Sequence, residues 1–387
     1  MNSKILFVTD KIRPGGGPSG YLYNLKNGFK RIPTINNEVD FLSFNDSNER
    51  HSSEANNSKT NIIKEIIKKI TFDLPSVINH YLFLKKNIDL KTINKAMEYD
   101  HVIIHGQNCF FLAKALKKQG VNYSVMLHGP TPLCDEGLMN LKEKQKKNSL
   151  FYHWLKFIDR YLLTNSQFIF SPSINAMDGY VDIFRKQLLP EKMKYIFSGV
   201  SQPCWSKEKA EVRRELNVSD KDCFILYAGR YVDHKGFDIY LECADLLKYK
   251  EHFKFFCAGD GYLKESINKR VCDLGWRKDV HDLINACDIL VIPNKQTYFD
   301  LLPIEAAALG TLIITTNVGG NKQLSELLPD VYISEPSASC IAEKIKTIAE
   351  STEEGGFYSA GNMEVYNNKL TDYHMAERWS NIIKELK

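Results

Sequence analysis

The sequence has no long run of apolar residues. A membrane-spanning helix needs about 18 or more in succession, and the longest runs here are short stretches such as residues 289–293. The apolar stretch at residues 5–8 is shorter than the roughly 7 to 15 residues of a secretory signal. We therefore predict a cytoplasmic protein that does not cross a bilayer.

Paired cysteines and repeats are also missing. Nine cysteines are scattered without a C-x-x-C pair, which indicates reduced thiols, no disulfide framework and no zinc or other metal site. The chain has no internal repeat and no low-complexity tract, and 43% hydrophobic with 25% charged residues is typical of a folded soluble protein. A length of 387 residues predicts two domains.

Charge is distributed unevenly. Residues 1–200 contain 28 Lys and Arg against 18 Asp and Glu, a net charge of +10, whereas residues 201–387 contain 23 against 29, a net charge of −6. A basic half is often only a solvated surface, but it can also attract an anionic membrane leaflet or a polyanionic substrate. No nucleic-acid-binding motif is present, and the acidic half would repel a phosphate backbone, so nucleic-acid binding is not expected.

Short apolar strands alternate with segments of helical period along the chain. Buried runs of this kind, separated by helices, predict parallel sheets covered on both faces. Glycine-rich turns after two of the strands indicate two doubly wound α/β units, with the boundary close to residues 199–203. The candidate strands are Ile5–Thr9, His101–His105, Tyr123–Leu127, Phe168–Ser171, Phe224–Ala228, Lys254–Ala258, Ile289–Pro293 and Leu312–Thr316.

Two segments of the first half are amphipathic and basic. In residues 59–70, five isoleucines share one helical face opposite lysines, and in residues 141–163 an apolar, partly aromatic face lies beside a lysine cluster. Both patterns fit ordinary helices that face the core. Basic flanks and aromatic residues are also what a surface that rests on anionic lipid requires.

Glycines follow the first strand. Gly15, Gly16 and Gly17 precede a helix that Pro18 and Ser19 could open, and such a turn lets backbone N–H groups and a helix N-terminus approach a phosphate. The pattern does not fit G-x-G-x-x-G, and no acidic residue ends a second strand about 20 residues later, so a dinucleotide dehydrogenase is not expected.

The second half carries charged residues just beyond its strands. Arg230 and Lys235 follow the strand that ends at Ala228, in the crevice where open α/β sheets bind ligands, and a planar fork beside a point charge suits a diphosphate. Pro303 and Glu305 stand where a helix begins. A carboxylate there can balance the helix dipole or accept hydrogen bonds from two ribose hydroxyls. Charged side chains are also common on protein surfaces, and these residues could lie there without binding a ligand.

In this order the motifs resemble the family 4 retaining glycosyltransferases. The resemblance runs over nearly the whole chain and is strongest from Tyr227 to Gly320. Each motif is weak alone, but together they are specific. They are the Gly-rich first loop, Gly199-Val200, Gly229-Arg230, Lys235-Gly236, Gly259-Asp260-Gly261 and Asp288 to Pro293.

The resemblance implies the GT-B fold, an α/β architecture of two facing Rossmann-like, doubly wound domains with the donor site in the interdomain cleft. Residues 1–200 would form the N-terminal, acceptor-binding domain and residues 201–365 the C-terminal, nucleotide-sugar-binding domain. Residues 366–387 would form a closing helix that crosses back to the first domain, with Trp379 as its packing anchor.

The resemblance also implies roles for single residues. Arg230 and Lys235 look like the pair that holds the donor diphosphate and steadies the leaving group, and His128 looks like the catalytic His that contacts the transferred sugar. Without the family, a His after a strand is more often structural. Glu305 matches the second Glu of the E-x7-E motif, which binds the ribose. The implied donor-binding set is Gly16, Gly17, Arg230, Lys235, Trp276, Thr297, Asp300, Leu301, Leu302 and Glu305.

One position departs from the family pattern. Thr297 stands where the first Glu of the motif contacts hydroxyls of the transferred sugar. Thr offers a hydroxyl without charge, so the donor sugar is unusual, or Asp300, which replaces a common Gly, substitutes for the carboxylate, or activity is lost.

The function implied is transfer of a sugar from a nucleotide diphosphate sugar, UDP- or GDP-linked, to a glycan or lipid-linked acceptor in bacterial surface polysaccharide synthesis. No cofactor or metal is expected, and residues 59–70 and 141–163 are the candidate contacts to the inner face of the membrane. The alternatives are a nucleotide-sugar epimerase and a non-catalytic GT-B partner subunit.

Overall fold

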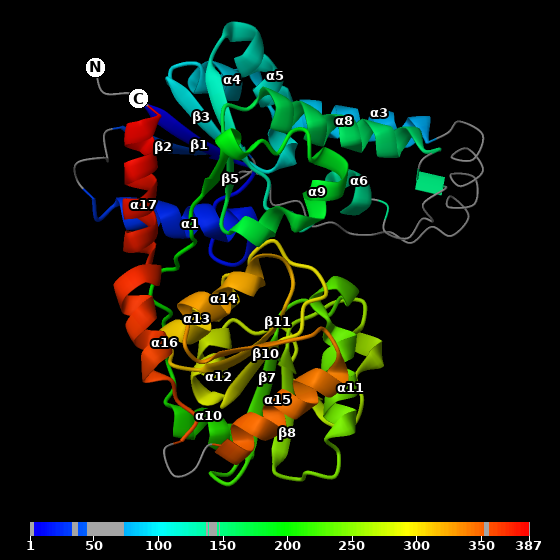
Figure 1. Ribbon diagram of the computed structural model, residues 1–387, viewed down its shortest axis with the longest axis vertical. Coiled ribbons are helices and arrows are strands. Elements are labelled where there is room, and N and C mark those ends of the chain that lie inside the picture. The colour runs from blue at the N-terminus through cyan, green and yellow to red at the C-terminus, as the bar shows by residue number, and fades with distance from the viewer. Residues whose placement is uncertain are drawn as a thin grey trace. The chain divides into compact units, whose positions relative to one another are not determined.

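The computed structural model describes residues 4–32, 38–44, 73–136, 138, 145–146, 148–351 and 356–386. They form two compact units, each built around one parallel sheet (Figure 1). The first unit comprises residues 1–171, 177–196 and 377–387, and the second comprises residues 172–176 and 197–376. The units therefore change after residue 196, and the C-terminal segment divides after residue 376.

The first unit contains a six-stranded sheet in the order β2-β1-β3-β4-β5-β6, and all neighbouring pairs are parallel. Its strands are β1 (Ile5–Thr9), β2 (Val39–Ser43), β3 (His101–His105), β4 (Asn122–Met126), β5 (Ile169–Ser171) and β6 (Met193–Tyr195). Its helices are α1 (Gly17–Phe29), α3 (Leu74–Asn87), α4 (Leu90–Ala96), α5 (Phe110–Gln119), α6 (Leu133–Glu136), α8 (Leu150–Asn165) and α9 (Asp178–Phe184).

The second unit repeats this plan with the order β12-β11-β10-β7-β8-β9, again parallel throughout. Its strands are β7 (Cys223–Ala228), β8 (Phe253–Ala258), β9 (Val271–Asp273), β10 (Ile289–Ile292), β11 (Leu312–Thr316) and β12 (Val331–Ser334). Its helices are α10 (Lys209–Glu215), α11 (Phe237–Leu246), α12 (Val280–Ala286), α13 (Leu302–Ala308), α14 (Leu324–Leu327), α15 (Ala338–Ser351) and α16 (Ala360–Val365), and α17 (Asp372–Glu385) follows.

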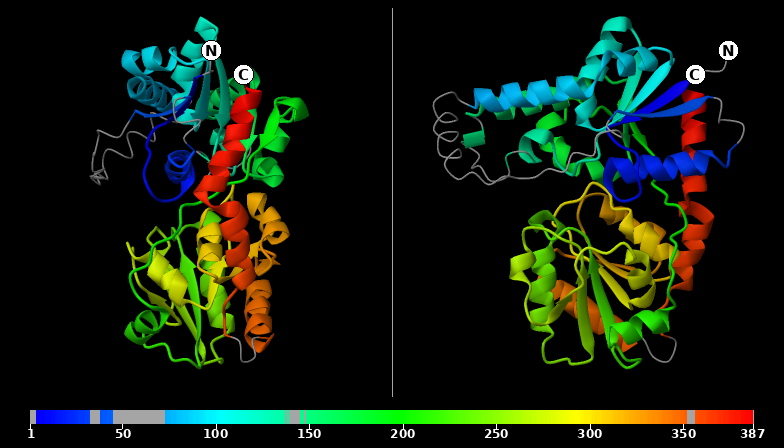
Figure 2. Two further views of the ribbon diagram at one scale, coloured as in Figure 1. Left: turned by 90° about the vertical axis from the view of Figure 1, so that its left-hand side faces the viewer. Right: turned by 180° about the vertical axis from the view of Figure 1, so that it is seen from behind.

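Alternating residues of the second sheet enter two different cores, because successive side chains of a strand point to opposite faces. In β7, Phe224 and Leu226 join one buried cluster, whereas Ile225 and Tyr227 join the other. The first cluster includes residues of α12 and α13, and the second includes residues of α11 and α15. Helices therefore cover both faces of the sheet (Figure 2), as the unbroken apolar strands predict.

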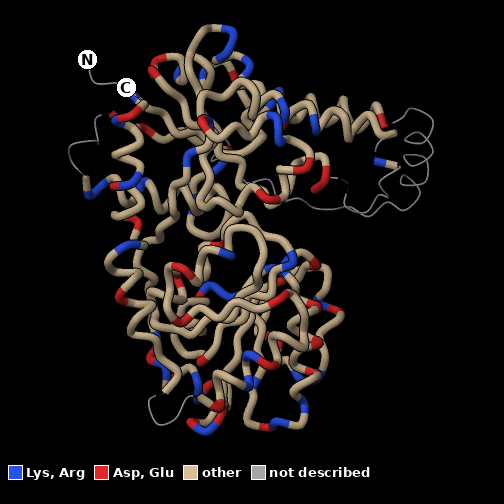
Figure 3. Tube along the Cα trace, in the orientation of Figure 1, with Lys and Arg blue, Asp and Glu red and all other residues tan. Residues whose placement is uncertain are grey.

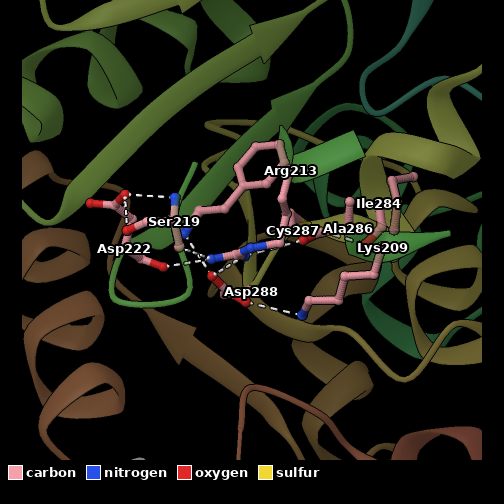
Figure 4. Close-up of polar contacts among 9 residues, drawn as sticks. Lys209, Arg213, Ser219, Asp222, Ile284, Ala286, Cys287 and Asp288 are labelled. Carbon is pink, nitrogen blue, oxygen red and sulfur yellow. Dashed lines mark hydrogen bonds and ion pairs between the residues drawn. The ribbon is translucent and has the colours of Figure 1, made fainter. Parts of the chain in front are cut away.

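A buried ion pair ties α10 to the start of β10 (Figure 4). Arg213 Nη1 lies 2.8 Å from Asp288 Oδ2, and its Nη2 donates to the backbone oxygens of Ser219 and Asp222 at 2.7 and 2.8 Å. Asp288 also accepts from the backbone N–H of Phe224 at 2.7 Å. The two opposite charges thus compensate each other at a site where both side chains are almost completely buried.

Trp379 of α17 is fully buried within the first unit. Its ring meets Phe7 of β1 edge-on at 5.0 Å between centroids and lies 4.7 Å from Phe170 of β5. Its indole Nε1 donates to the hydroxyl of Tyr21 on α1 at 2.9 Å. One side chain from the end of the chain therefore contacts α1 and two strands of the first sheet.

Candidate functional site

The carboxyl edge of the second sheet gathers the charged residues that the sequence singles out. Parallel strands end at the same edge, so the loops after β7, β10 and β11 meet there. The first of these loops carries Arg230 and Lys235, the second carries Thr297 and Asp300, and α13, with Glu305 in its first turn, follows.

Lys235 and Asp300 form an ion pair at this edge. Lys235 Nζ lies 2.6 Å from Asp300 Oδ1. Gly236, next in the chain, has φ 65°, and a Cβ on it would lie 1.8 Å from the backbone oxygen of Pro293 at the end of β10. Glycine is therefore required for the lysine-bearing turn to pack against the loop that carries its partner.

A polar network surrounds the Asp300 carboxylate. Oδ2 accepts from the side-chain amides of Asn294 and of Asn321, the latter at 3.3 Å. Burial opposes ionisation, but the charge of Lys235 and hydrogen bonds from Lys235, Asn321 and Thr297 outweigh it, and the pKa of Asp300 is lowered. The carboxylate that the sequence offers as a substitute for the missing Glu is thus ionised and already held by protein donors.

Arg230 lies exposed beside a histidine. Its Nη2 is 3.3 Å from Nε2 of His234, in the 3₁₀ turn Asp233–Lys235. Burial, followed by the charges of Arg230 and Lys235, lowers the pKa of His234. A neutral imidazole can accept the guanidinium N–H, which orients the cation without adding charge.

Glu305 pairs with a histidine that the sequence did not point to. Its Oε2 lies 3.4 Å from Nε2 of His281 on α12, and neither side chain is fully buried. The hydrogen bond that the imidazole donates to the Glu305 carboxylate is the main reason why the pKa of His281 is raised. This carboxylate therefore meets an imidazole that is more readily protonated than usual.

The remaining donor-binding candidates of the second unit differ in exposure. Trp276 is 68% exposed, so its ring presents a free face. Leu301 belongs to the buried apolar cluster on the α12–α13 side of the sheet, and Leu302 packs against that cluster. A ligand at these two positions would meet backbone N–H groups of the first turn of α13, because the side chains are used in the core.

In the first unit, the glycine loop precedes α1. Gly16 and Gly17 are exposed, Gly17 has φ 69°, and the first turn of α1 contains no acidic residue. The loop folds back on the helix, because a Cβ on Gly20 would lie 1.4 Å from the backbone oxygen of Gly15. The structure thus places the loop at a helix N-terminus, the setting that suits an anion.

His128 follows β4 in a backbone conformation that is rare for non-glycine residues, with φ 65°. Its Nε2 lies 2.7 Å from Nδ1 of His105, the last residue of β3. Burial lowers the pKa of His128 to about 3. The predicted catalytic histidine is therefore a neutral imidazole bonded to a second imidazole, a partner that no spacing rule indicates.

Residues 222–351 match the sequence family described as Glycosyl transferases group 1. This range includes all of the second-unit candidates from Arg230 to Glu305. The match covers about a third of the chain, within the second unit.

Curated relatives of the chain include glycosyltransferases. An uncharacterized glycosyltransferase of Methanocaldococcus jannaschii is 24% identical over 214 residues, which are 50% of this chain and 53% of the relative. The match therefore spans about half of that relative. The N,N'-diacetylbacillosaminyl-diphospho-undecaprenol alpha-1,3-N-acetylgalactosaminyltransferase of Campylobacter jejuni is 24% identical over 286 residues, 70% of this chain and 74% of that enzyme.

Solved structures share the architecture of the chain at low identity. Sucrose-phosphate synthase from Thermosynechococcus elongatus superposes with a TM-score of 0.69 at 15% identity and covers 99% of both chains. Anabaena HepE, solved in complex with UDP-glucose, gives a TM-score of 0.67 at 16% identity, with 99% of this chain and 100% of that chain covered. The chain has the GT-B fold.

Proposed function

We propose that the chain is a retaining glycosyltransferase that moves a sugar from a nucleotide diphosphate donor to a glycan or lipid-linked acceptor in bacterial surface polysaccharide synthesis. The observation that carries the proposal is the pair of cations, Arg230 and Lys235, at the carboxyl edge of the second sheet, with the Glu305 carboxylate at the start of α13. Anabaena HepE, which shares the fold, binds UDP-glucose, and this supports a nucleotide-sugar donor.

In the proposed reaction, the bond between the anomeric carbon and the diphosphate oxygen breaks while the acceptor oxygen bonds to the same face of that carbon. The hydroxyl proton of the acceptor passes to the departing diphosphate oxygen. Negative charge then grows on the diphosphate. Arg230 offers a planar fork of hydrogen-bond donors. The Lys235 ammonium group gives one N–H to Asp300, and its other N–H groups can bind a phosphate. Preorganised cations of this kind stabilise the leaving group, so we propose transfer without a metal cofactor.

Glu305 would accept hydrogen bonds from the ribose hydroxyls, and Trp276 would lie beside the base. The Gly16-Gly17 loop and His128 are the proposed contributions of the first unit to donor binding. Asp300, with Thr297 beside it, would hold Lys235 in place rather than replace the missing Glu, because its carboxylate oxygens already accept from protein donors.

A thermal-shift panel of UDP-, GDP- and ADP-sugars tests the donor class. A ligand at a hundredfold excess over its Kd stabilises the folded state by ~2.7 kcal/mol, which is a shift of roughly 5–11 °C for a domain of this size class. We expect the nucleotide sugars of one base to raise the melting temperature by this amount. Arg230→Ala and Glu305→Ala should each abolish the shift. Arg214→Ala, an exposed arginine on α10, is the control and should leave the shift unchanged.

The outcomes separate the candidate functions. No shift with any nucleotide sugar contradicts the proposal. A shift without turnover against a broad acceptor panel supports the non-catalytic partner subunit, which Thr297 motivates. A new nucleotide sugar formed without acceptor supports an epimerase. With turnover, NMR of the product anomer decides between retention and inversion.

We also propose that the first unit contacts an anionic membrane while it takes a lipid-linked acceptor, as the name of the Campylobacter relative suggests for that enzyme. Residues 59–70 lie outside the described residues. Of the predicted segment 141–163, α8 turns Leu155, Ile158 and Leu162 into the core, so that much of its apolar face is unavailable to lipid.

Among the described residues, five large apolar side chains of α3 are exposed, and this helix packs beside α8 (Figure 1). Leu82 and Phe83 are 54% and 51% exposed, and Phe157 of α8 is 46% exposed. Lysines 85 and 86 lie in the last turn of α3, and Figure 3 draws the lysines and arginines of the described residues in blue. Exposed apolar groups next to basic ones favour an anionic bilayer as the partner.

Flotation with phosphatidylglycerol vesicles at low salt tests the membrane proposal. We expect the protein to float with the vesicles and the double variant Leu82→Glu with Phe83→Glu to remain behind. Leu246→Glu, an equally exposed leucine of the second unit, should still float. If the unchanged protein does not bind, the membrane part of the proposal is wrong.

None of the helices formed by the described residues combines the length and apolar character that a bilayer crossing requires.

A further inference from the structure

Two imidazoles meet at the carboxyl ends of adjacent strands in the first unit. β3 and β4 pair in parallel with His105 opposite Met126, and His128 lies two residues beyond the end of β4. His105 is 2% exposed, and its Nδ1 lies 2.7 Å from Nε2 of His128. The distance is that of a hydrogen bond, so one of these two nitrogens carries a proton and the other accepts it.

The second nitrogen of His105 decides which way this bond runs. Its Nε2 is buried, and no described residue lies within hydrogen-bond reach of it. If His128 donated from Nε2, the neutral His105 ring would carry its own proton on Nε2, as a buried N–H without an acceptor. Buried main-chain N–H groups without an acceptor are rarer than under-used main-chain acceptors, and we apply the same order to the imidazole. The bond therefore runs from Nδ1–H of His105 to Nε2 of His128.

An aromatic side chain fixes the rings in this arrangement. Tyr21 of α1 meets the ring of His128 edge-on at 5.1 Å between centroids and lies 5.5 Å from the ring of His105. The Tyr21 hydroxyl is itself held by the indole of Trp379 at 2.9 Å. Four side chains, from α1, α17, the end of β3 and the loop after β4, therefore form one contiguous cluster that restricts rotation of both imidazoles.

We propose that His105 is a positioning residue that holds His128 in one ring orientation and in the tautomer protonated on Nδ1. Nε2 of His128 then accepts the hydrogen bond from His105. It therefore cannot take a proton from the hydroxyl group of the substrate that receives the sugar. The only ring proton that a neutral His128 then carries is on Nδ1, and the departing diphosphate oxygen receives the proton of the acceptor hydroxyl. The catalytic part of this inference rests on the proposed transferase function, whereas the tautomer does not.

Imidazole nitrogen NMR on the purified chain tests the tautomer directly. In the unchanged protein, we expect long-range proton–nitrogen correlations of His128 that show a protonated Nδ1 and an unprotonated Nε2. His105→Phe keeps a buried ring but removes the donor, and should shift the nitrogen signals of His128 toward a tautomer mixture. His105→Asn, whose amide can reach the position of Nδ1, should restore a single tautomer.

His101→Phe is the matched control. His101 is as buried as His105 and begins the same strand, but its Nε2 contacts Ser124 at 2.8 Å. This variant should leave the His128 signals where they are. The proposal is overturned if His128 carries its proton on Nε2 in the unchanged protein, or if His105→Phe and His101→Phe affect His128 alike.

A kinetic measurement tests the positioning role in the reaction. With an active donor, His105→Phe should lower kcat by about 10-fold or more, because small displacements of a reacting group are costly, while KM for the donor stays within twofold. His105→Asn should recover most of the loss. Equal losses in both variants contradict positioning. Absence of turnover in the unchanged protein would instead count against the transferase function, and the NMR result would still decide the tautomer.

Discussion

The buried pair of Arg213 and Asp288 offers a sharp test of how the second unit is held together (Figure 4). The perturbation is Arg213→Met, which keeps an unbranched apolar stem and removes the guanidinium. Only 7% of the Arg213 side chain and 4% of the Asp288 side chain are exposed. The substitution therefore leaves a carboxylate inside the protein with its main counter-charge gone.

The size of the effect follows from this geometry. Removing one partner of a buried ion pair costs about 3–5 kcal/mol, because the remaining charge is desolvated without compensation. Arg213 also donates to the backbone oxygens of Ser219 and Asp222, so these acceptors lose a partner too. For a domain of 150–250 residues, this corresponds to a fall in melting temperature of roughly 6–20 °C.

Differential scanning calorimetry can follow the transition of the second unit. Lys209→Met is the matched control, because Lys209 Nζ lies 3.0 Å from Oδ1 of the same carboxylate but its side chain is 42% exposed. An exposed pair contributes about 0–1 kcal/mol, so this variant should melt within about 4 °C of the unchanged protein. Adding Asp288→Asn to Arg213→Met should recover part of the loss, because the uncompensated charge is gone. Equal effects of the arginine and lysine variants would refute the argument from burial.

Three further predictions concern the glycine turn and two titrating groups. Gly236→Ala should destabilise the second unit well beyond the ~1–2 kcal/mol that a left-handed alanine costs, whereas Gly275→Ala, with a similar φ but open space around its Cβ, should cost only that amount; denaturant titrations compare them. Burial raises the pKa of Asp159 to about 7, so the folded state binds the proton more tightly and stability should fall as pH rises from about 4 to 7; Asp159→Asn should flatten that slope in melting curves. The raised pKa of His281 adds stability at low pH that is lost as pH rises through its folded value, and Glu305→Gln should lower that pKa in NMR titrations.

The sequence predicted the centre of each sheet but not its edges. The eight expected strands correspond to β1, β3, β4, β5, β7, β8, β10 and β11, and the four that were not predicted, β2, β6, β9 and β12, are the outermost strands of the two sheets. A central strand is buried on both faces and reads as an unbroken apolar run. An edge strand pairs on one side only and keeps exposed positions, as in β9, where two of three residues are exposed. Such a strand has no comparable signature.

The sequence predicted which residues belong to the candidate site, but not which side chains they contact. Spacing placed Lys235, Glu305 and His128 after strands or at a helix start, because the local signals are strong there. Their contacts to Asp300, His281 and His105 join residues 65, 24 and 23 positions apart, and such pairings depend on how the strands are ordered in the sheet. Asp300 itself had been noted, but as a replacement for the missing Glu and not as the partner of Lys235.

The positions of the cysteines allow thiol labelling to measure local unfolding of the first unit. Cys204 and Cys272 are exposed and lie in the second unit, whereas both cysteines of the first unit, Cys109 and Cys134, are buried. A thiol reagent should therefore label the second unit at once and reach the first only when that unit opens, because a shielded thiol does not react. The rate of that slow labelling measures local unfolding of the first unit without an engineered probe, and a bound ligand that steadies α1, β3 or β4 should slow it.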